Sequence, residues 1–362
     1  MKENMKRYFE IAQEKFNNLK TKQDVVVLAF ESSCDDTCVA LVKNGRELIS
    51  HAISSQIEIH KRFGGVVPEV ASRNHLLAIT NILENVMAES KLTYADVDAI
   101  AVTYGAGLSG ALMVSVNFAK SLAFALKLPL IRVNHIKAHV SANYVCHKDL
   151  KPPFLSLIVS GGHTALVEVK DYVNNELIET THDDAIGEAY DKVAKVLGLD
   201  YPGGPIIEKH AKNGNPNIEF ISKPTSLSLD RVFSFSGLKS AVINYLHKLE
   251  QNGEKANIDD VCASFQKQAI DIVANKSINC AVEKGYDKIV LAGGVACNHA
   301  LRERLENLGS THNIKVLYPT GIMCTDNAVM VGSEAYNLIK AGEGLADLDL
   351  NANPSINLKF VK

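Results

Sequence analysis

The pentapeptide His135-Ile-Lys-Ala-His139 carries two imidazoles four residues apart. It follows an apolar, strand-like run at 128–133 and opens a segment with helical spacing. On a helix the two rings lie one turn apart on the same face, with Cβ atoms about 5–6 Å from each other. Neutral ring nitrogens so placed can bind one transition-metal ion at about 2.0–2.1 Å. Alternatively, both histidines are capping or core residues satisfied by the backbone.

Three acidic residues could extend this chemistry. Asp326 opens the last helical segment, where it would either cap the helix or act as a third metal ligand. Asp35 and Asp36 occupy a turn, where they could orient a nucleophile, bind a cation or merely fill the turn. A zinc-protease helix needs glutamate directly after its first histidine, and that position is Ile136.

Two glycine pairs lie where a phosphate could approach the backbone. Ser160-Gly-Gly-His163 joins two apolar runs, and glycine lets N–H groups reach an anion without an obstructing Cβ, although a simple hairpin is the commoner use. Gly293-Gly294 precedes a helix start, where free N–H groups favour an anion, but the pattern is not G-x-G-x-x-G. Asn298, which follows, could bind a base or ribose, or cap the helix.

Two other segments contain candidate sugar contacts. Asp191, early in a helical segment, could hold a ribose hydroxyl or form an ordinary i,i+4 pair with Lys195. Gly204 lies in the rigid turn Tyr201-Pro-Gly-Gly-Pro205 and could pack against a sugar.

Length and composition limit the class of protein. The 362 residues suggest about two domains, and 46% hydrophobic with 22% charged residues is ordinary for a globular protein. The net charge of −3 provides no global basic field for nucleic acid. Seven cysteines without a C-x-x-C pair favour reduced thiols in the cytoplasm. No uninterrupted apolar run approaches the roughly 20 residues of a membrane span, and no signal-peptide core is evident.

The predicted elements repeat along the chain. Each half has three strands joined by tight turns, followed by helices and strands in alternation. This predicts an α/β fold of two duplicated lobes with a central cleft, into which the glycine and aspartate turns would point. The predicted domains are a polar, helical N-terminal arm at 1–24, a first lobe at 25–150, a second lobe at 151–340 and a C-terminal tail at 341–362. The last helix of the second lobe could pack back on the first.

The ordered set of motifs resembles the tRNA N6-adenosine threonylcarbamoyltransferase family (TsaD-type, formerly described as a glycoprotease family). The resemblance extends from about residue 25 to 340 and rests on nine segments. They are ESSCDDT (31–37), GGVVPEVASRNH (64–75), HIKAH (135–139), SGGHTAL (160–166), GEAYDKVAK (187–195), YPGGP (201–205), FSFSGLKSA (233–241), AGGVACN (292–298) and CTDNA (324–328).

The resemblance implies an actin-like ATPase (ASKHA) fold and a specific reaction. The threonylcarbamoyl group would pass from threonylcarbamoyl-AMP to N6 of the adenosine just 3′ of the anticodon, in tRNAs that read ANN codons. The hypothesis from the residues is that Asp35 or Asp36 deprotonates or orients the attacking amine.

The resemblance also assigns site residues. His135, His139 and Asp326 would bind one metal ion per subunit, iron in preference to zinc, with magnesium and ATP as further candidates. The adenylate would contact Ile158, Val159, Ser160, Gly161, Gly162, Asp191, Gly204, Glu208 and Asn298. Glu208 stands where many relatives have aspartate, and Ala138 replaces a common glycine. Because a ligating histidine must be neutral, metal affinity is predicted to fall below about pH 6.5.

The partners implied are tRNA, threonylcarbamoyl-AMP, a paralogous non-catalytic subunit and a small P-loop ATPase, with no membrane and a cytoplasmic location. Three alternatives stay open. An actin-like kinase or ATPase would share the fold but give the two histidines no role. A metallopeptidase lacks its glutamate at position 136. A non-catalytic scaffold is disfavoured because the site motifs are intact.

Overall fold

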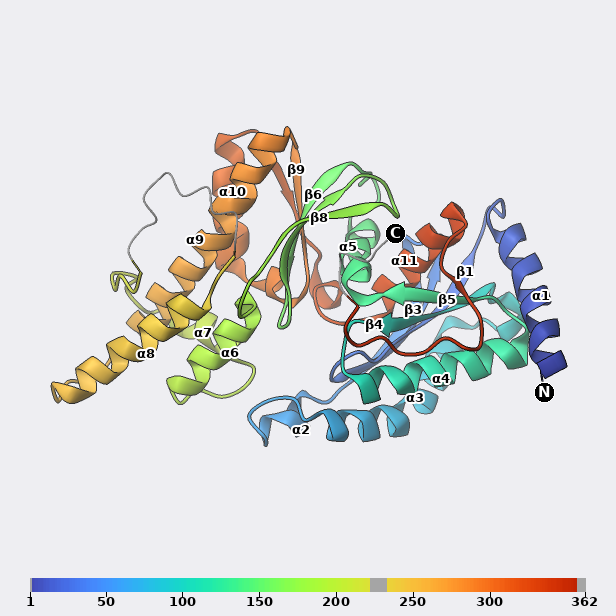
Figure 1. Ribbon diagram of the computed structural model, residues 1–362, viewed down its shortest axis with the longest axis horizontal. Coiled ribbons are helices and arrows are strands. Elements are labelled where there is room, and N and C mark those ends of the chain that lie inside the picture. The colour runs from blue at the N-terminus through green and yellow to red at the C-terminus, as the bar shows by residue number, and fades with distance from the viewer. Residues whose placement is uncertain (1, 222–232, 357–362) are drawn as a thin grey trace. The chain divides into compact units, whose positions relative to one another are not determined.

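The computed structural model describes residues 2–221 and 233–356, which form two compact units (Figure 1). Unit 1 comprises Met1–Pro152, Lys170–Asn175 and Thr320–Lys362, and unit 2 comprises Pro153–Val169 and Glu176–Pro319. The stretch from about residue 213 to 230 is rich in Asn, Pro and Ser, which predicts a loop, and it lies partly outside the described residues. The cleft predicted between the lobes stays a prediction.

A six-stranded sheet forms the centre of unit 1, in the order β11-β5-β4-β1-β2-β3. Its strands are β1 (Val26–Glu31), β2 (Asp36–Lys43), β3 (Glu47–Ser55), β4 (Ala99–Gly105), β5 (Leu130–Asn134) and β11 (Leu345–Ala346). β1, β2 and β3 pair antiparallel, whereas β1, β4 and β5 run parallel. The turn between β1 and β2 contains Asp35, so this hairpin carries the predicted aspartates at the end of a central strand.

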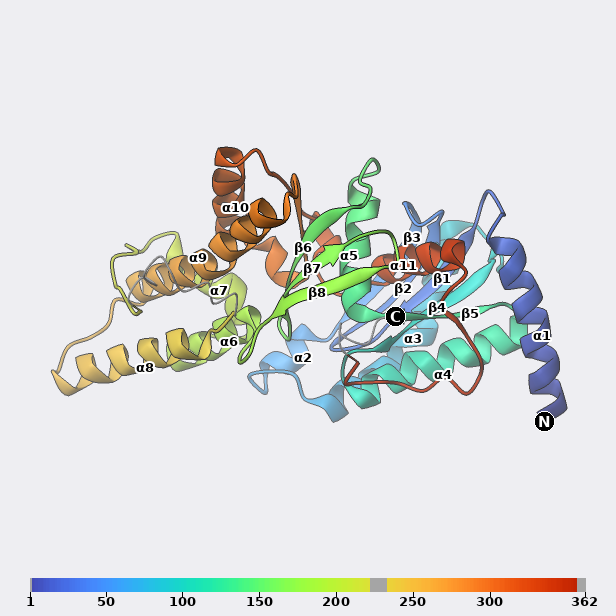
Figure 2. The ribbon, with the colours of Figure 1, turned by 45° about the horizontal axis from the view of Figure 1, so that its top comes forward.

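Helices cover both faces of this sheet, so β1 is apolar at every position until its last residue. Leu28 and Phe30 pack with α3 (Pro68–Ser90) and α4 (Ser109–Leu126) on one face. Val27 and Ala29 pack with α5 (His135–Cys146) and α11 (Ala328–Ala341) on the other. Figure 2 shows these layers from a second direction. Burial on both faces explains the continuous apolar run.

The N-terminal arm is a helix packed on unit 1. α1 (Lys2–Leu19) buries Tyr8, Ala12, Phe16 and Leu19 along one face. The hydroxyl of Tyr8 donates to the carbonyl of Leu128 at 3.0 Å. The arm is therefore part of the folded body, because its apolar stripe is matched by the edge of the unit 1 core.

Among the described residues, α4 is the single helix long and apolar enough to cross a membrane, judged by length and composition. Polar residues such as Asn117 and Lys120 interrupt it, so the sequence shows no uninterrupted apolar run. Its Val116 and Ala119 are buried in the core under the sheet.

The C-terminal segment, which carries little sequence signal, follows the unit 1 sheet. β11 pairs antiparallel with β5, and the amide of Asn353 donates to the carbonyl of Tyr104 at 2.6 Å. The amide of Gly107 donates to the carbonyl of Pro354 at 3.3 Å. These contacts use backbone atoms, which explains why no side-chain pattern reveals them.

Unit 2 contains a five-stranded sheet in the order β10-β9-β6-β7-β8. Its strands are β6 (Phe154–Val159), β7 (Thr164–Val169), β8 (Asn175–Thr180), β9 (Lys288–Ala292) and β10 (Lys315–Leu317). Its helices are α6 (Ile186–Val196), α7 (Gly203–Ala211), α8 (Ser236–Gln251), α9 (Ile258–Lys284) and α10 (His299–Thr311). The order β5-β4-β1-β2-β3 of unit 1 recurs here as β10-β9-β6-β7-β8, so the predicted duplication is confirmed.

Short elements complete the chain. They are α2 (Ile57–Lys61) and the 3₁₀ turns η1 (Tyr94–Asp96), η2 (Gly294–Cys297) and η3 (Gly321–Met323). The last helix, α11, belongs to unit 1, where it packs against α5.

Candidate functional site

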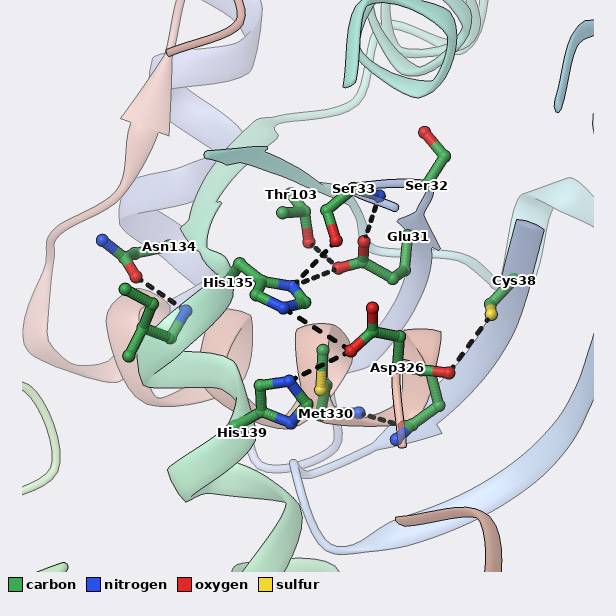
Figure 3. Close-up of polar contacts among 12 residues, drawn as sticks. Glu31, Ser32, Ser33, Cys38, Thr103, Asn134, His135, His139, Asp326 and Met330 are labelled. Atoms are coloured by element: carbon green, nitrogen blue, oxygen red, sulfur yellow. Dashed lines mark hydrogen bonds and ion pairs between the residues drawn. The ribbon is translucent and has the colours of Figure 1, made fainter. Parts of the chain in front are cut away.

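His135, His139 and Asp326 converge in unit 1 (Figure 3). Oδ1 of Asp326 lies 3.1 Å from Nε2 of His139 and 3.5 Å from Nε2 of His135. A tetrahedral ion with bonds of about 2.0–2.1 Å holds neighbouring ligand atoms about 3.3 Å apart. The three side chains therefore have the spacing of a metal site.

Two helix caps position these three side chains. The side chain of Asn134 accepts hydrogen bonds from the amides of Ile136 and Lys137, which fixes the first turn of α5. The side chain of Asn327 accepts from the amide of Met330, so Asn327 is the residue that caps α11. Asp326 belongs to unit 1, because α11 packs against the strands of the unit 1 sheet.

Buried polar contacts fix α5 against α11. The hydroxyl of Ser141 donates to Oε2 of Glu334 at 2.6 Å, and that of Ser333 donates to the carbonyl of Ser141 at 3.0 Å. Ala138 is fully buried in the same core, so the residue that replaces a common glycine is a packing residue here.

The donor chemistry fits a metal ion. Nδ1 of His139 is buried and lacks a hydrogen-bond partner among the described residues, and Nε2 is buried beside the carboxylate of Asp326. Buried polar atoms are normally satisfied, and a bound metal ion would give this imidazole and the carboxylate a shared partner. Two imidazoles and one carboxylate form a donor set that both iron(II) and zinc accept.

Glu31 is a site residue that the sequence did not reveal as one. Its buried carboxylate accepts hydrogen bonds from the amide of Ser33 and the hydroxyl of Thr103, both at 2.5 Å, and lies 3.2 Å from Nδ1 of His135. A carboxylate behind a ligating histidine fixes its tautomer and orientation. The sequence feature that could have indicated its role is a glutamate at the end of an otherwise apolar strand.

The charges around His135 together outweigh the effect of burial on its pKa. Burial alone would lower the pKa of His135, but Asp326 and Glu31 raise it to about 9. The pKa of Glu31, which burial would raise, is held below its usual value by the charge and hydrogen bond of His135. The imidazole of His135 therefore lies between two carboxylates and is stabilised by both of them in its protonated form.

Asp36 differs from Asp35 in its surroundings. Burial, assisted by the charges of Asp35 and Asp326, raises the pKa of Asp36 to about 7, although a hydrogen bond from Ser55 opposes the shift. Its Oδ1 is buried without a hydrogen-bond partner among the described residues. A carboxylate poised near neutral pH suits proton abstraction.

The predicted glycine turn forms a compact cluster in unit 2. The amide of Ser160 donates to the carbonyl of His163 at 2.8 Å, which closes the turn between β6 and β7. Gly187 at the start of α6 and Gly293 after β9 press against this turn, where a Cβ would meet the carbonyl of Ser160 at 2.6 Å and that of Val159 at 2.5 Å. A Cβ on Gly161 or Gly162 would meet nothing within 4 Å, so these backbone groups face open space.

Asp191 on α6 contacts Gly203, which with Gly204 forms the glycine pair of the predicted Tyr201–Pro205 turn. Oδ1 of Asp191 accepts from the amide of Gly203 at 2.7 Å, and burial raises the pKa of this carboxyl. Gly203 packs tightly on α6, whereas a Cβ on Gly204 would meet nothing within 4 Å. Of the two glycines, Gly204 is therefore the one that leaves space for a ligand.

The remaining predicted contacts lie at the start of α10. Asn298 caps α10 by accepting from the amide of Leu301, and its Nδ2 donates to Oε1 of Gln266 at 3.0 Å. Oε1 of Glu208 accepts from the amide of His299 at 2.8 Å. Asn298 thus has the capping role that the sequence left open, with Gln266 as a partner not anticipated. The side chain of Ile158 is buried, and this residue pairs with Ala165 of β7 within the sheet.

Solved structures define the class of fold. HypF from T. kodakarensis aligns with a TM-score of 0.60 and 15% identity, covering 90% of this chain and 49% of that one. Full-length HypF in the phosphate- and nucleotide-bound form gives a TM-score of 0.57 and 14% identity, covering 88% and 47%. At this identity the likeness concerns the fold alone, which is the actin-like ATPase (ASKHA) fold.

Sequence relatives define the family. The model of the family described as TsaD, tRNA N6-adenosine threonylcarbamoyltransferase, matches residues 47–333. Proteins of that name from Clostridium perfringens (strain SM101 / Type A) and Clostridium novyi (strain NT) are 53% and 52% identical. They cover 92% and 93% of this chain and 98% of their own length. The chain belongs to the tRNA N6-adenosine threonylcarbamoyltransferase family, as its motifs predict.

Proposed function

We propose that this protein transfers the threonylcarbamoyl group from threonylcarbamoyl-AMP to N6 of the adenosine 3′ of the anticodon, in tRNAs that read ANN codons. A bond forms between N6 and the carbamoyl carbon, the bond from that carbon to the phosphate oxygen breaks, and AMP leaves as its anion. N6 gives up one proton. The observation that carries the proposal is the convergence of His135, His139 and Asp326 beside Asp36 in a chain of this family.

The residues of unit 1 would carry out the chemical step. Bound at His135, His139 and Asp326, a metal ion would supply Lewis acidity toward the carbamoyl group. Glu31 orients His135, and Asp36 accepts the proton of the attacking amine. Asp35, beside it, raises the basicity of Asp36 through its charge.

The glycine cluster of unit 2 would hold the adenylate. The open backbone at Gly161 and Gly162 suits a phosphate, which needs N–H donors and close approach. The second oxygen of Asp191 would accept from a ribose hydroxyl, and Asn298 with Glu208 would border the ribose and base. Ile158, Val159 and Ser160 would contribute backbone contacts.

Replacing Gly204 with valine tests the adenylate site without disturbing the fold, because a side chain there meets open space in the free protein. We expect binding of threonylcarbamoyl-AMP to weaken by at least about tenfold, since the added bulk occupies the ligand's space. Isothermal titration calorimetry with a non-hydrolysable analogue measures this. Gly237→Val is a matched control, because Gly237 holds the same second position of a helix and is equally open. Equal affinities for both variants would contradict the assignment.

We propose iron as the resident metal, because two histidines and one carboxylate form the usual set for non-haem iron(II). Elemental analysis of protein purified without oxygen or added metal tests this proposal. A content of one zinc ion per chain, with no iron, would show that the resident metal is zinc and not iron. Magnesium with ATP stays a proposal with no residue assigned.

Metal affinity is expected to depend on pH up to about 9. Because the pKa of His135 is raised to about 9 without metal, an ion must displace a proton below that pH. Affinity should rise about tenfold per pH unit from pH 7 and level off near 9, instead of levelling near 6.5 as the sequence alone predicts. Competition with a chromophoric chelator measures the profile. In Glu31→Gln the break should move to lower pH, and a flat wild-type profile between pH 7 and 9 would refute the argument.

The partner subunits are also proposals. Leu76 and Leu77 on α3 and Met113 on α4 are exposed on helices that pack together, which would suit a paralogous subunit. A small P-loop ATPase and a cytoplasmic location complete the proposal. Because the net charge is −3, we expect tRNA to bind a local basic surface shared with a partner, and this binding should weaken in salt.

One assay tests the function as a whole. The purified chain, with its partner subunits and an adenylate-forming enzyme, is incubated with labelled threonine, bicarbonate, ATP and tRNA. Label in threonylcarbamoyladenosine supports the proposal. Absence of label, together with cleavage of casein or phosphorylation of a small molecule by the same preparation, would favour the peptidase or kinase alternative.

A further inference from the structure

Phe63 is a large aromatic side chain that the fold leaves in solvent, with 58% of its surface exposed. It lies in the loop between α2 and α3, after Lys61 and Arg62 and before Gly64-Gly65. Figure 1 shows α2 and this loop standing out from the rest of unit 1. The exposed leucines of α3 follow one another in the helix, whereas Phe63 has only charged residues and glycines beside it in sequence. Its setting is basic and polar, unlike that of an apolar protein interface.

The backbone conformation of this loop keeps Phe63 at the surface. The amides of Phe63 and Gly65 both donate to the carbonyl of His60, at 3.0 and 3.3 Å. His60 is fully buried, and its Nδ1 accepts from the amide of Val67 at 3.3 Å. Gly64 and Gly65 adopt φ values of +69° and +152°, which other residues rarely take. The loop is therefore preformed and presents its aromatic ring at low conformational cost.

Both ends of this loop are joined to the turn of Asp35 and Asp36. Before the loop, Ser55 pairs with Asp36 across the sheet, and the amide of Gln56 donates to the carbonyl of Asp35 at 3.1 Å. After it, Nε2 of the buried His75 on α3 lies 2.9 Å from the carbonyl of Cys34. A ligand bound by this loop would therefore contact a segment that is hydrogen-bonded to the turn next to Asp36, the candidate proton acceptor.

We propose that Phe63 is a stacking platform for an unpaired base of the substrate tRNA, with Arg62 contacting the adjacent phosphate. This inference rests on the proposed function and names the surface that recognises its RNA substrate. Single-stranded RNA is recognised by aromatic rings that stack on bases together with cations that follow the backbone. Lys61 pairs with Glu58 and Arg73 with Glu69, whereas Arg62 forms no ion pair among the residues described, so its charge is available. The anticodon loop offers such unpaired bases.

The test measures RNA affinity in the assembly that carries out transfer. A fluorescent anticodon stem-loop with an ANN-reading anticodon is titrated against the wild type, Phe63→Ala and Phe63→Trp. Phe63→Ala should weaken binding about 5- to 150-fold, and Phe63→Trp should retain it, because stacking needs only an aromatic ring. Arg62→Gln should reduce the slope of log affinity against log salt by about one. Phe124→Ala is the control, since Phe124 is also a phenylalanine with 42% exposure and lies on α4.

Each result has a defined meaning. Unchanged RNA affinity in Phe63→Ala overturns the inference. Light scattering measures whether the variant also assembles less well with its partner subunits. If weaker assembly accounts for the whole loss of RNA affinity, the inference is overturned, because Phe63 would then contact a protein subunit and not RNA. Failure of the wild type to modify tRNA would instead overturn the proposed function. Metal content and adenylate affinity should be the same in all variants, which separates a defect in RNA binding from misfolding.

Discussion

Replacing His139 with alanine should remove the bound metal and lower the transfer rate about 100- to 10,000-fold. His139 is one of the three side chains that converge at the candidate metal site, so its loss leaves two ligands for the ion. A Lewis acid contributes several kcal/mol to a transition state in which negative charge develops, and about 1.4 kcal/mol corresponds to tenfold in rate. Elemental analysis and single-turnover transfer measure the two effects.

The control for this substitution is His147→Ala, at the other end of the same helix. His147 contributes backbone contacts at the end of α5 and no metal ligand, so metal content and rate should stay near those of the wild type. Asp326→Asn should resemble His139→Ala, because a neutral amide oxygen is the weaker ligand. Full metal content in folded His139→Ala would exclude this residue as a ligand.

Replacing Asp36 with asparagine should lower single-turnover transfer about 100- to 10,000-fold, the usual contribution of a general base. A base acts only when ionised. With the pKa of Asp36 raised to about 7, wild-type transfer should therefore be lost as pH falls below 7 and reach a plateau above it. The variant should lack this dependence. A rate equal to that of the wild type at pH 8 would show that Asp36 takes no proton.

Thermal unfolding separates this effect from damage to the fold. A carboxyl whose pKa is higher in the folded state than in the unfolded state stabilises the fold below its unfolded pKa, and that stability is lost as pH rises through about 7. Asp36→Asn should therefore be at least as stable as the wild type at pH 8. Asp35→Asn should move the break in the activity profile to lower pH, because Asp35 helps to raise the pKa of Asp36.

Local patterns predicted those parts of the site that depend on neighbouring residues. The i,i+4 spacing of His135 and His139 places both rings on one face of a helix, whatever the rest of the chain does. The turns at Asp35 and at Ser160 follow from apolar runs interrupted by polar residues or glycines. The repeated order of strands and helices likewise predicted the duplicated α/β fold.

Contacts between distant segments could not be predicted this way. Asp326 reaches the histidines because α11 packs on α5, and these two helices are far apart in the sequence. Glu31 forms part of an apolar run, and its role becomes visible only when Thr103 and His135 are brought beside it. The C-terminal segment pairs through backbone groups, which leave no residue pattern.

The burial of α5 governs how an ion would enter and leave the site. The side chains of His135 and His139 are 11% and 3% exposed, and that of Asp326 is 23% exposed. Exchange with solvent would pass by the carboxylate and require local opening, which is slow in a well-packed core. A chelator should therefore remove the metal ion from the folded protein slowly. The identity of the ion found after purification would then depend on which metal was available in the cell while the chain was folding.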